Sequence, residues 1–268
     1  MGDITEVTGM VLSAMPVGEF DRRIVLLTKE RGKISAFAKG ARRPNSPLTG
    51  VTRAFVFGTF QVYEGRTSYN IRQANITNYF ESLLTDYDGV CYACYFAELA
   101  DYYGRENLDA SVMINLLYAA VRAVSNPNIS NQLIRYIYEL RLIAINGENP
   151  DMFTCGGCGG EENLALYSPS YHRMFCEKCK RSAGSKINAV SEIKAGGKVN
   201  AGSTVNINDG IRVSQSTVYT LQYILTSPLE RLFTFTVSSD VLAELGRIMK
   251  IVCDDVFDKN MKSLELLP

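Results

Sequence analysis

Alternating apolar and polar residues along the first 80 positions predict β-strands with one buried face. The alternation is clear at Ile34, Ala36 and Ala38, and it recurs from Phe55 to Gln61. Turn residues separate segments rich in Val, Ile, Thr, Phe and Tyr, so we expect five strands, at 5–15, 22–28, 32–40, 53–64 and 68–80. Five short strands in this length favour a small barrel of the OB type, and an SH3-like barrel is the nearest alternative.

Beyond Tyr79 the apolar residues recur every three or four positions, which predicts helices. Asp109 and Ser130 are suited to cap two of them, and Asn146-Gly147 is suited to end the second. We expect helices at 86–103, 109–126, 130–146, 214–226 and 239–259. The predicted fold class is therefore α+β with several domains: a five-stranded OB-type barrel, then an all-α domain that carries an insertion.

The domain boundaries follow from these changes of period. We expect the barrel over 1–80 and the helical domain in two parts, 81–150 and 213–268. Between the two parts lie a cysteine-bearing segment, 151–184, and a polar loop rich in Gly, Asn and Ser, 185–212.

Four of the seven cysteines form two CxxC pairs, Cys155-x2-Cys158 and Cys176-x2-Cys179. Each pair lets two thiolates converge on one cation, and a hairpin between the pairs would complete a tetrahedral sulfur cage. Four protein ligands leave no position for water, so we expect one structural Zn²⁺ in a zinc ribbon and no catalytic metal. The alternative is a set of reduced or redox-active cysteines.

The other cysteines and the single histidine are expected to be structural. Cys91 and Cys94 form a third CxxC, but it falls inside a predicted buried helix with no second pair nearby, which favours core packing over redox or metal chemistry. Cys253 is expected to be buried in the last helix. His172 falls between the two ligand pairs, where an exposed hairpin residue is favoured over a substitute ligand.

Positive charge is concentrated near the N-terminus although the chain balances 28 Lys and Arg against 28 Asp and Glu. Residues 1–80 hold 11 cations and 6 acids, and between Arg22 and Arg53 nine cations face one acid, Glu30. Such clusters bind phosphate backbones, and OB barrels add aromatic rings that stack on bases. The aromatic candidates, most of them expected in the core, are Phe37, Phe55, Phe57 and Phe60. The alternative is a solvated charged face.

Motifs for catalysis are absent from the sequence. A single histidine excludes HExxH, and neither a phosphate-binding GxxxxGK[ST] loop nor a GxGxxG after a strand occurs. This favours a binding protein over an enzyme. The N-terminus lacks the pattern of a secretory signal and no apolar run approaches the length of a membrane span, so we expect a cytoplasmic protein with no membrane contact.

The order of these parts resembles the RecO family of bacterial recombination mediators. The stretches that carry the resemblance are 18–50, 137–159 and KSLELL at 262–267, and only 186–212 departs from the family by its length. The resemblance implies a non-enzymatic DNA repair protein, nucleoid-associated in the cytoplasm, that binds single- and double-stranded DNA and anneals complementary strands. It also implies binding to RecR and to the acidic C-terminal tail of single-stranded DNA-binding protein, and through them help in loading RecA.

The resemblance also implies positions for these contacts. In the family the barrel and the basic surface beside it carry DNA, which here implies contacts at Arg22, Arg23, Lys33, Lys39, Arg42 and Arg43. The acidic tail ends in an apolar aromatic residue and needs cations beside an apolar hollow, which we place around Arg135 and Arg141. Because some members lack the cysteines, zinc is expected to stabilise the fold. The alternatives are a zinc-ribbon protein associated with RNA or transcription and a metal-dependent nuclease, although no carboxylate cluster supports the nuclease.

Overall fold

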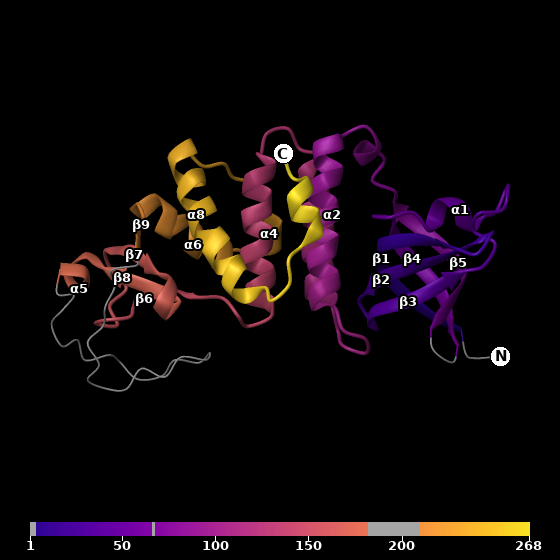
Figure 1. Cartoon of the computed structure of the whole chain (residues 1–268), viewed down its shortest axis with the longest axis horizontal. Helices are drawn as coiled ribbons and strands as arrows, with labels where there is room; N and C mark the ends of the chain where they lie inside the picture. The colour runs from indigo at the N-terminus through magenta and orange to yellow at the C-terminus, as the bar shows by residue number, and fades with distance from the viewer. Residues whose placement is uncertain (1–3, 66–67, 182–209) are drawn as a thin grey trace. The chain divides into compact units, whose positions relative to one another are not determined.

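A computed structural model describes residues 4–65, 68–181 and 210–268 (Figure 1). Most of the predicted polar loop therefore lies outside the described residues. The chain forms two compact units. The first unit comprises residues 1–138 and 261–268, and the second unit comprises residues 139–260.

Five strands of the first unit close a barrel in the order β1-β2-β3-β5-β4, which confirms the predicted OB-type barrel. All pairs are antiparallel except β3 with β5. The alternating residues fill its core, which includes Ile24, Leu26, Ile34, Ala36 and Phe60. A short helix, α1 (Leu48–Val51), follows β3 in the sequence and lies beside the barrel (Figure 1). The strands are β1 (Ile4–Val17), β2 (Asp21–Thr28), β3 (Gly32–Ala38), β4 (Phe57–Glu64) and β5 (Tyr69–Asn78).

The fourth strand begins four residues later than predicted, because the backbone reverses just before it. Phe55 has a φ of 68°, and its buried ring precedes the strand. Within β4 the buried residues are Gly58, Phe60 and Val62, so Phe57 lies on the outer face of the strand. The alternating positions Phe57, Thr59 and Gln61 thus face outward in β4, and the inward positions are Gly58, Phe60 and Val62.

The helices of the first unit begin within two residues of their predicted starts. The Asp86 carboxylate accepts a hydrogen bond from the Gly89 N–H at 2.9 Å and starts α2 (Tyr87–Tyr103). Then follow α3 (Ser111–Val124) and α4 (Asn131–Ile145), and a 3₁₀ turn, η1 (Glu81–Leu84), precedes α2. Residues 261–268 return to α2, where the Glu98 carboxylate accepts hydrogen bonds from the Lys262 and Ser263 N–H groups at 3.0 and 2.8 Å. They form the 3₁₀ turn η3 (Lys262–Leu266).

The second unit combines a small sheet with helices. Its four strands lie in the order β6-β8-β7-β9, and its helices include α6 and α8. The Glu244 carboxylate of α8 accepts hydrogen bonds from the Ser214 N–H and hydroxyl at 2.8 and 2.9 Å. These bonds connect α8 to the N-terminus of α6. The elements are β6 (Asp151–Cys155), β7 (Leu164–Ser168), the 3₁₀ turn η2 (Pro169–Tyr171), β8 (Arg173–Cys176), α5 (Glu177–Arg181), β9 (Ile211–Arg212), α6 (Gln215–Thr226), α7 (Leu229–Leu232) and α8 (Ser239–Val256).

The end of the predicted polar loop is part of this sheet. Ile211 and Arg212 pair with Tyr167 and Leu166 of β7, although the sequence predicted a loop to residue 212. Only the backbone pairing reveals this strand, because two residues are too short for a periodic signal. No helix in the described ranges is long and apolar enough to cross a membrane.

Candidate nucleic-acid interface and metal centre

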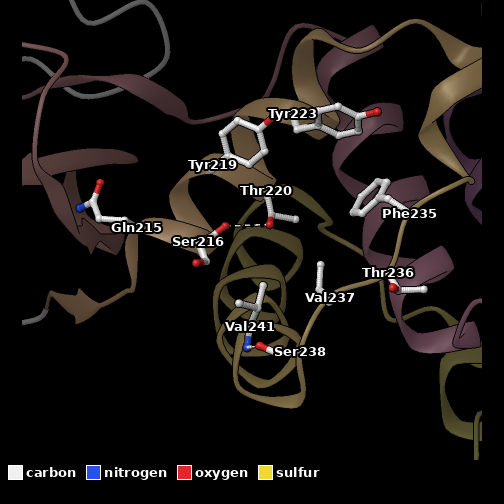
Figure 2. Close-up of a pocket in the computed structure, with 10 residues that line it drawn as sticks. All are labelled: Gln215, Ser216, Tyr219, Thr220, Tyr223, Phe235, Thr236, Val237, Ser238 and Val241. Carbon is white, nitrogen blue, oxygen red and sulfur yellow. Dashed lines mark hydrogen bonds between the residues drawn. The ribbon is translucent and has the colours of Figure 1, made fainter.

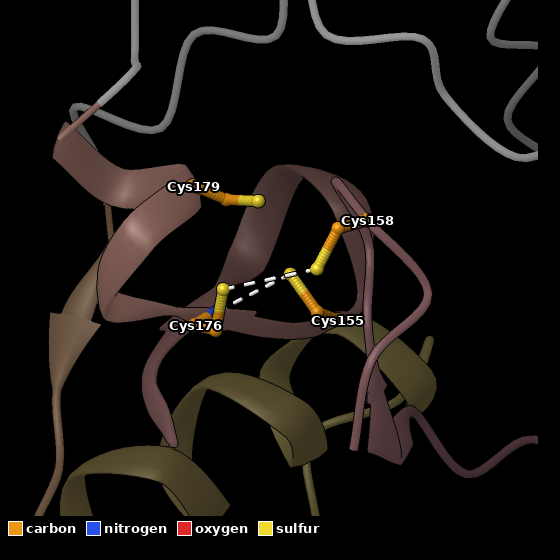
Figure 3. A group of neighbouring side chains, drawn as sticks. All are labelled: Cys155, Cys158, Cys176 and Cys179. Carbon is orange, nitrogen blue, oxygen red and sulfur yellow. Dashed lines mark hydrogen bonds between the residues drawn. The ribbon is translucent and has the colours of Figure 1, made fainter. Parts of the chain in front are cut away.

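The four cysteines of the two CxxC pairs lie together in the second unit. Their Sγ atoms are all within 4.8 Å of one another and point toward a common centre (Figure 3). Cys155 ends β6, Cys158 follows in the turn, Cys176 ends β8 and Cys179 lies in α5. The structure thus brings both predicted pairs into the one cluster that the spacing requires.

Local backbone geometry explains why the turn after β6 can close on the cage. A Cβ atom at Gly156 would lie 2.5 Å from Cδ of Arg173 and 2.8 Å from Cζ of Phe175, so a side chain there would force these groups to move. Gly159 has a φ of 72°, a conformation that favours glycine. Backbone N–H groups also face the sulfur, because those of Gly157 and Cys176 lie 3.4 and 3.2 Å from Sγ of Cys155.

The thiols of the cage favour a bound cation. Burial raises the pKa of the Cys155 and Cys179 thiols, and the neighbouring Cys176 thiol adds to the rise at Cys179. Burial acts the same way on Cys176, but hydrogen bonds from the Cys179 N–H and the adjacent thiols outweigh it and lower its pKa to about 7. Thiolates this close repel one another, and a soft divalent cation at their centre would stabilise all four. The donor set therefore fits a four-coordinate metal.

The remaining cysteines and His172 lie outside this cage. Cys91 and Cys253 are buried, and burial raises the pKa of the half-buried Cys94 thiol in α2. The exposed His172 lies after β7, where its Nδ1 is 2.9 Å from Oδ2 of Asp255. It therefore has a carboxylate partner instead of a place in the cage.

A cluster of cations lies at one end of the barrel, which we call the cationic end and define as residues 18–23 and 39–43. The antiparallel pairing of Arg22 with Ala38 sets the β1–β2 turn beside the segment that leaves β3. Backbone N–H groups join them: that of Arg42 donates to the Phe20 carbonyl at 2.8 Å, and that of Gly40 donates to Oδ1 of Asp21 at 2.7 Å. Strand pairing therefore collects cations that are almost 20 positions apart in sequence.

The six predicted DNA contacts differ in how they are engaged. Arg23, Lys39, Arg42 and Arg43 are exposed, and none of them has an ion-pair partner among the residues that the structure describes. Arg22 is half-buried and donates to the Thr49 carbonyl and the Thr52 hydroxyl at 2.9 and 3.1 Å, which holds α1 against the barrel. Lys33 donates to the Asp101 carbonyl at 2.6 Å and lies 3.3 Å from Oδ1 of the same residue.

Of the aromatic candidates, none lies exposed at the cationic end. Phe55 and Phe60 are buried, Phe37 is half-buried, and the Phe57 ring packs 4.7 Å from that of Tyr118. The exposed ring beside the cations is instead Phe20, with the Arg43 guanidinium carbon 5.2 Å from its centroid. Sequence reasoning missed Phe20, although its place in the first loop of an OB barrel was a usable signal.

Arg135 and Arg141 lie on α4 and have different surroundings. The guanidinium of Arg135 stacks on Tyr95 and Tyr136, 5.3 and 5.7 Å from their ring centroids. Arg141 is half-buried and donates to the Leu225 carbonyl at 2.5 Å, and burial lowers its pKa. Six residues of helix turn these side chains roughly 120° apart. Their joint role in holding an acidic tail stays a prediction.

An apolar hollow of about 680 Å³ lies between α6 and the start of α8 in the second unit (Figure 2). The rings of Tyr219, Tyr223 and Phe235 and the side chains of Val237 and Val241 line it, with hydroxyl and amide groups beside them. None of its lining residues is charged. The hollow has the apolar surface that the terminal aromatic residue of an acidic peptide tail would need. It lacks the cations that the acidic residues of such a tail would need.

Together these features define a class of α+β proteins that join an OB-type barrel with a cationic end to helices and a four-cysteine ribbon. The family model described as recombination protein O N terminal matches residues 1–80, and that described as recombination protein O C terminal matches residues 84–192. The chain belongs to the RecO family of DNA repair and recombination proteins.

Two individual relatives match nearly the whole chain, and a third matches about two thirds of it. "DNA repair protein RecO" of Acetivibrio thermocellus is 27% identical over 261 residues, which cover 97% of this chain and 94% of the relative. The protein of the same description from Clostridium perfringens is 24% identical over 265 residues, covering 98% and 97%. That of Desulforudis audaxviator is 33% identical over 172 residues, covering 64% and 68%.

Proposed function

We propose that this protein is a non-enzymatic mediator of DNA repair that binds single- and double-stranded DNA and anneals complementary strands. The observation that carries the proposal is the cationic end of the barrel, where Arg23, Lys39, Arg42 and Arg43 are exposed without ion-pair partners among the described residues. Cations in this state release the counterions of a phosphate backbone on binding, which drives association without regard to sequence.

Annealing needs no bond chemistry, so this arrangement is sufficient for it. Guanidinium and ammonium groups lower the repulsion between two strands, and contacts limited to the backbone leave the bases able to test different registers. Arg22 and Lys33 bond to other parts of the first unit. They therefore contribute to the positive electrostatic potential of the surface more than to direct contacts with phosphates.

Membership of the RecO family supports the rest of the proposal. The partners are RecR and the acidic C-terminal tail of single-stranded DNA-binding protein, with Arg135 and Arg141 as proposed tail contacts, and RecA is loaded indirectly. The protein acts in the cytoplasm at the nucleoid. The four-cysteine cage holds one structural Zn²⁺, because a set of four thiolates is closed to substrate and suits this ion.

Annealing of coated strands tests the proposal. Complementary strands are first covered with single-stranded DNA-binding protein, either complete or lacking its acidic tail, and duplex formation is followed by fluorescence. We expect acceleration on bare strands and on strands coated with the complete protein, with a smaller effect when the tail is missing. Failure to bind or anneal bare strands would reject the proposal, and tighter binding to RNA of the same sequence would favour an RNA-associated role instead.

A further inference from the structure

The turn between β1 and β2 displays an aromatic ring that the barrel core does not use. Gly18 has a φ of 56°, which reverses the chain and places Phe20 at the tip with 37% of its surface exposed. Met15 and Val17 beside it are 53% and 38% exposed. Three large apolar side chains thus face water at one hairpin, whereas the core of the same barrel is fully buried.

The ring is held in place by the neighbouring cations. The Arg42 N–H donates to the Phe20 carbonyl at 2.8 Å, and its guanidinium donates to the carbonyls of Gly18 and Glu19, both at 3.3 Å. The Arg43 guanidinium lies over the ring at 5.2 Å. A ring fixed in this way loses little conformational freedom when a ligand packs against it.

The charge around the ring identifies the kind of ligand. The cationic end contains five cations and two acids, and one acid, Asp21, accepts a hydrogen bond from the Gly40 N–H. A ligand that suits it is anionic and carries flat apolar groups. A single nucleic-acid strand has both, because its phosphates lie beside unpaired bases, whereas a duplex keeps the faces of its bases stacked inside. In OB barrels the loop between the first two strands is also among those that bind oligonucleotides.

We infer that Phe20 is a stacking platform for an unpaired base of single-stranded DNA, while Arg43 contacts the adjoining phosphate and Arg42, besides its own phosphate contact, positions the turn. The inference deepens the proposed function, on which it rests, by assigning a preference for single strands to one side chain. A base that leaves the platform is free to pair, so this contact is compatible with annealing.

Fluorescence anisotropy with three probes tests the platform: oligothymidylate, an abasic strand with the same number of phosphates, and a duplex. We expect Phe20→Ala to weaken binding of oligothymidylate by about five- to 100-fold, in the range of one base–aromatic stack, and to leave the abasic strand and the duplex within about twofold. Arg43→Ala should weaken all three. Tyr87→Ala removes a ring that is 76% exposed in α2 and serves as the matched control with no expected effect.

A second variant reports stacking directly. The chain contains no tryptophan, so Phe20→Trp introduces a single indole whose fluorescence is free of background from others. We expect oligothymidylate to quench it and the abasic strand to leave it unchanged. Retained affinity in Phe20→Trp with loss in Phe20→Ala would show that the ring acts as a flat surface.

The outcomes separate the inference from the proposed function. Equal weakening of oligothymidylate and abasic strand by Phe20→Ala would overturn the inference, since the ring would then only support Arg43. Unchanged affinity of Phe20→Ala together with an unquenched indole in Phe20→Trp would also overturn the inference. The proposed function would still stand in that case, provided that the wild-type protein binds DNA. If the wild-type protein bound none of the three probes, the proposed function itself would fail.

Discussion

Replacing Lys39 and Arg43 together by alanine should reduce the salt dependence of single-strand binding by a predictable amount. The cationic end presents four exposed cations without ion-pair partners among the described residues, Arg23, Lys39, Arg42 and Arg43. Each phosphate contact contributes about −0.7 to the slope of log K against log salt for single strands. Four contacts give a slope of about −2.8, and the double variant is expected at about −1.4.

These slopes translate into a large difference in a simple titration. A fourfold rise in salt should weaken wild-type binding by about 50-fold and binding by the double variant by about sevenfold. The assay is anisotropy of a labelled oligothymidylate at four or more salt concentrations, with protein folding checked by thermal unfolding. Equal slopes for wild type and variant would refute the assignment of these side chains to phosphates, whatever the change in affinity at one salt concentration.

Two controls sharpen this measurement. Arg231→Ala with Lys250→Ala removes two exposed cations of the second unit and should leave the slope unchanged. Lys33→Ala removes a member of the predicted contact set whose ammonium already pairs with Asp101 at 3.3 Å. We expect its slope to stay within about 0.3 of the wild-type value, less than half of one phosphate contact.

Two further predictions concern the second unit. Cys176→Ser should lower the bound zinc, measured by elemental analysis, from one ion per chain toward zero. It should also reduce the melting temperature, because structural zinc supplies folding free energy. Binding of DNA by the barrel should persist. Burial raises the pKa of Asp151, but hydrogen bonds from the Thr154 hydroxyl and two backbone N–H groups, with Arg173 nearby, lower it overall. Such a carboxyl stabilises the fold above its unfolded pKa and loses this contribution as the pH falls below about 4, so urea titrations of Asp151→Asn should show a smaller loss of stability between pH 7 and pH 3 than the wild type.

Local patterns were sufficient for most elements of the fold. The period of two at Ile34, Ala36 and Ala38 predicted a strand with one buried face, and the proposed caps Asp109 and Ser130 predicted helix starts within two residues. The CxxC spacing predicted the cage because each pair supplies two of the four thiolate ligands from positions close together in the sequence. These features share one property: the residues that determine them are neighbours in sequence.

Features that depend on distant residues were not predictable. Lys33 forms an ion pair with Asp101, which lies 68 positions away in the sequence. From the sequence alone, Lys33 was expected to be a free cation. Pairing of β9 with β7 depends on the sheet and not on the composition of two residues. In the sequence Phe20 is an ordinary turn residue. Only the structure shows that Arg42 bonds to its carbonyl and that the Arg43 guanidinium stacks on its ring.

The return of residues 261–268 to α2 has a consequence for how the chain is made. The Glu98 carboxylate binds backbone N–H groups that follow it by more than 160 positions, and Met261 is buried in the same unit. On a ribosome, these residues emerge only after all of residues 139–260. The first unit therefore cannot be completed during early synthesis, and α2 must wait with an uncovered side until the second unit has left the exit tunnel.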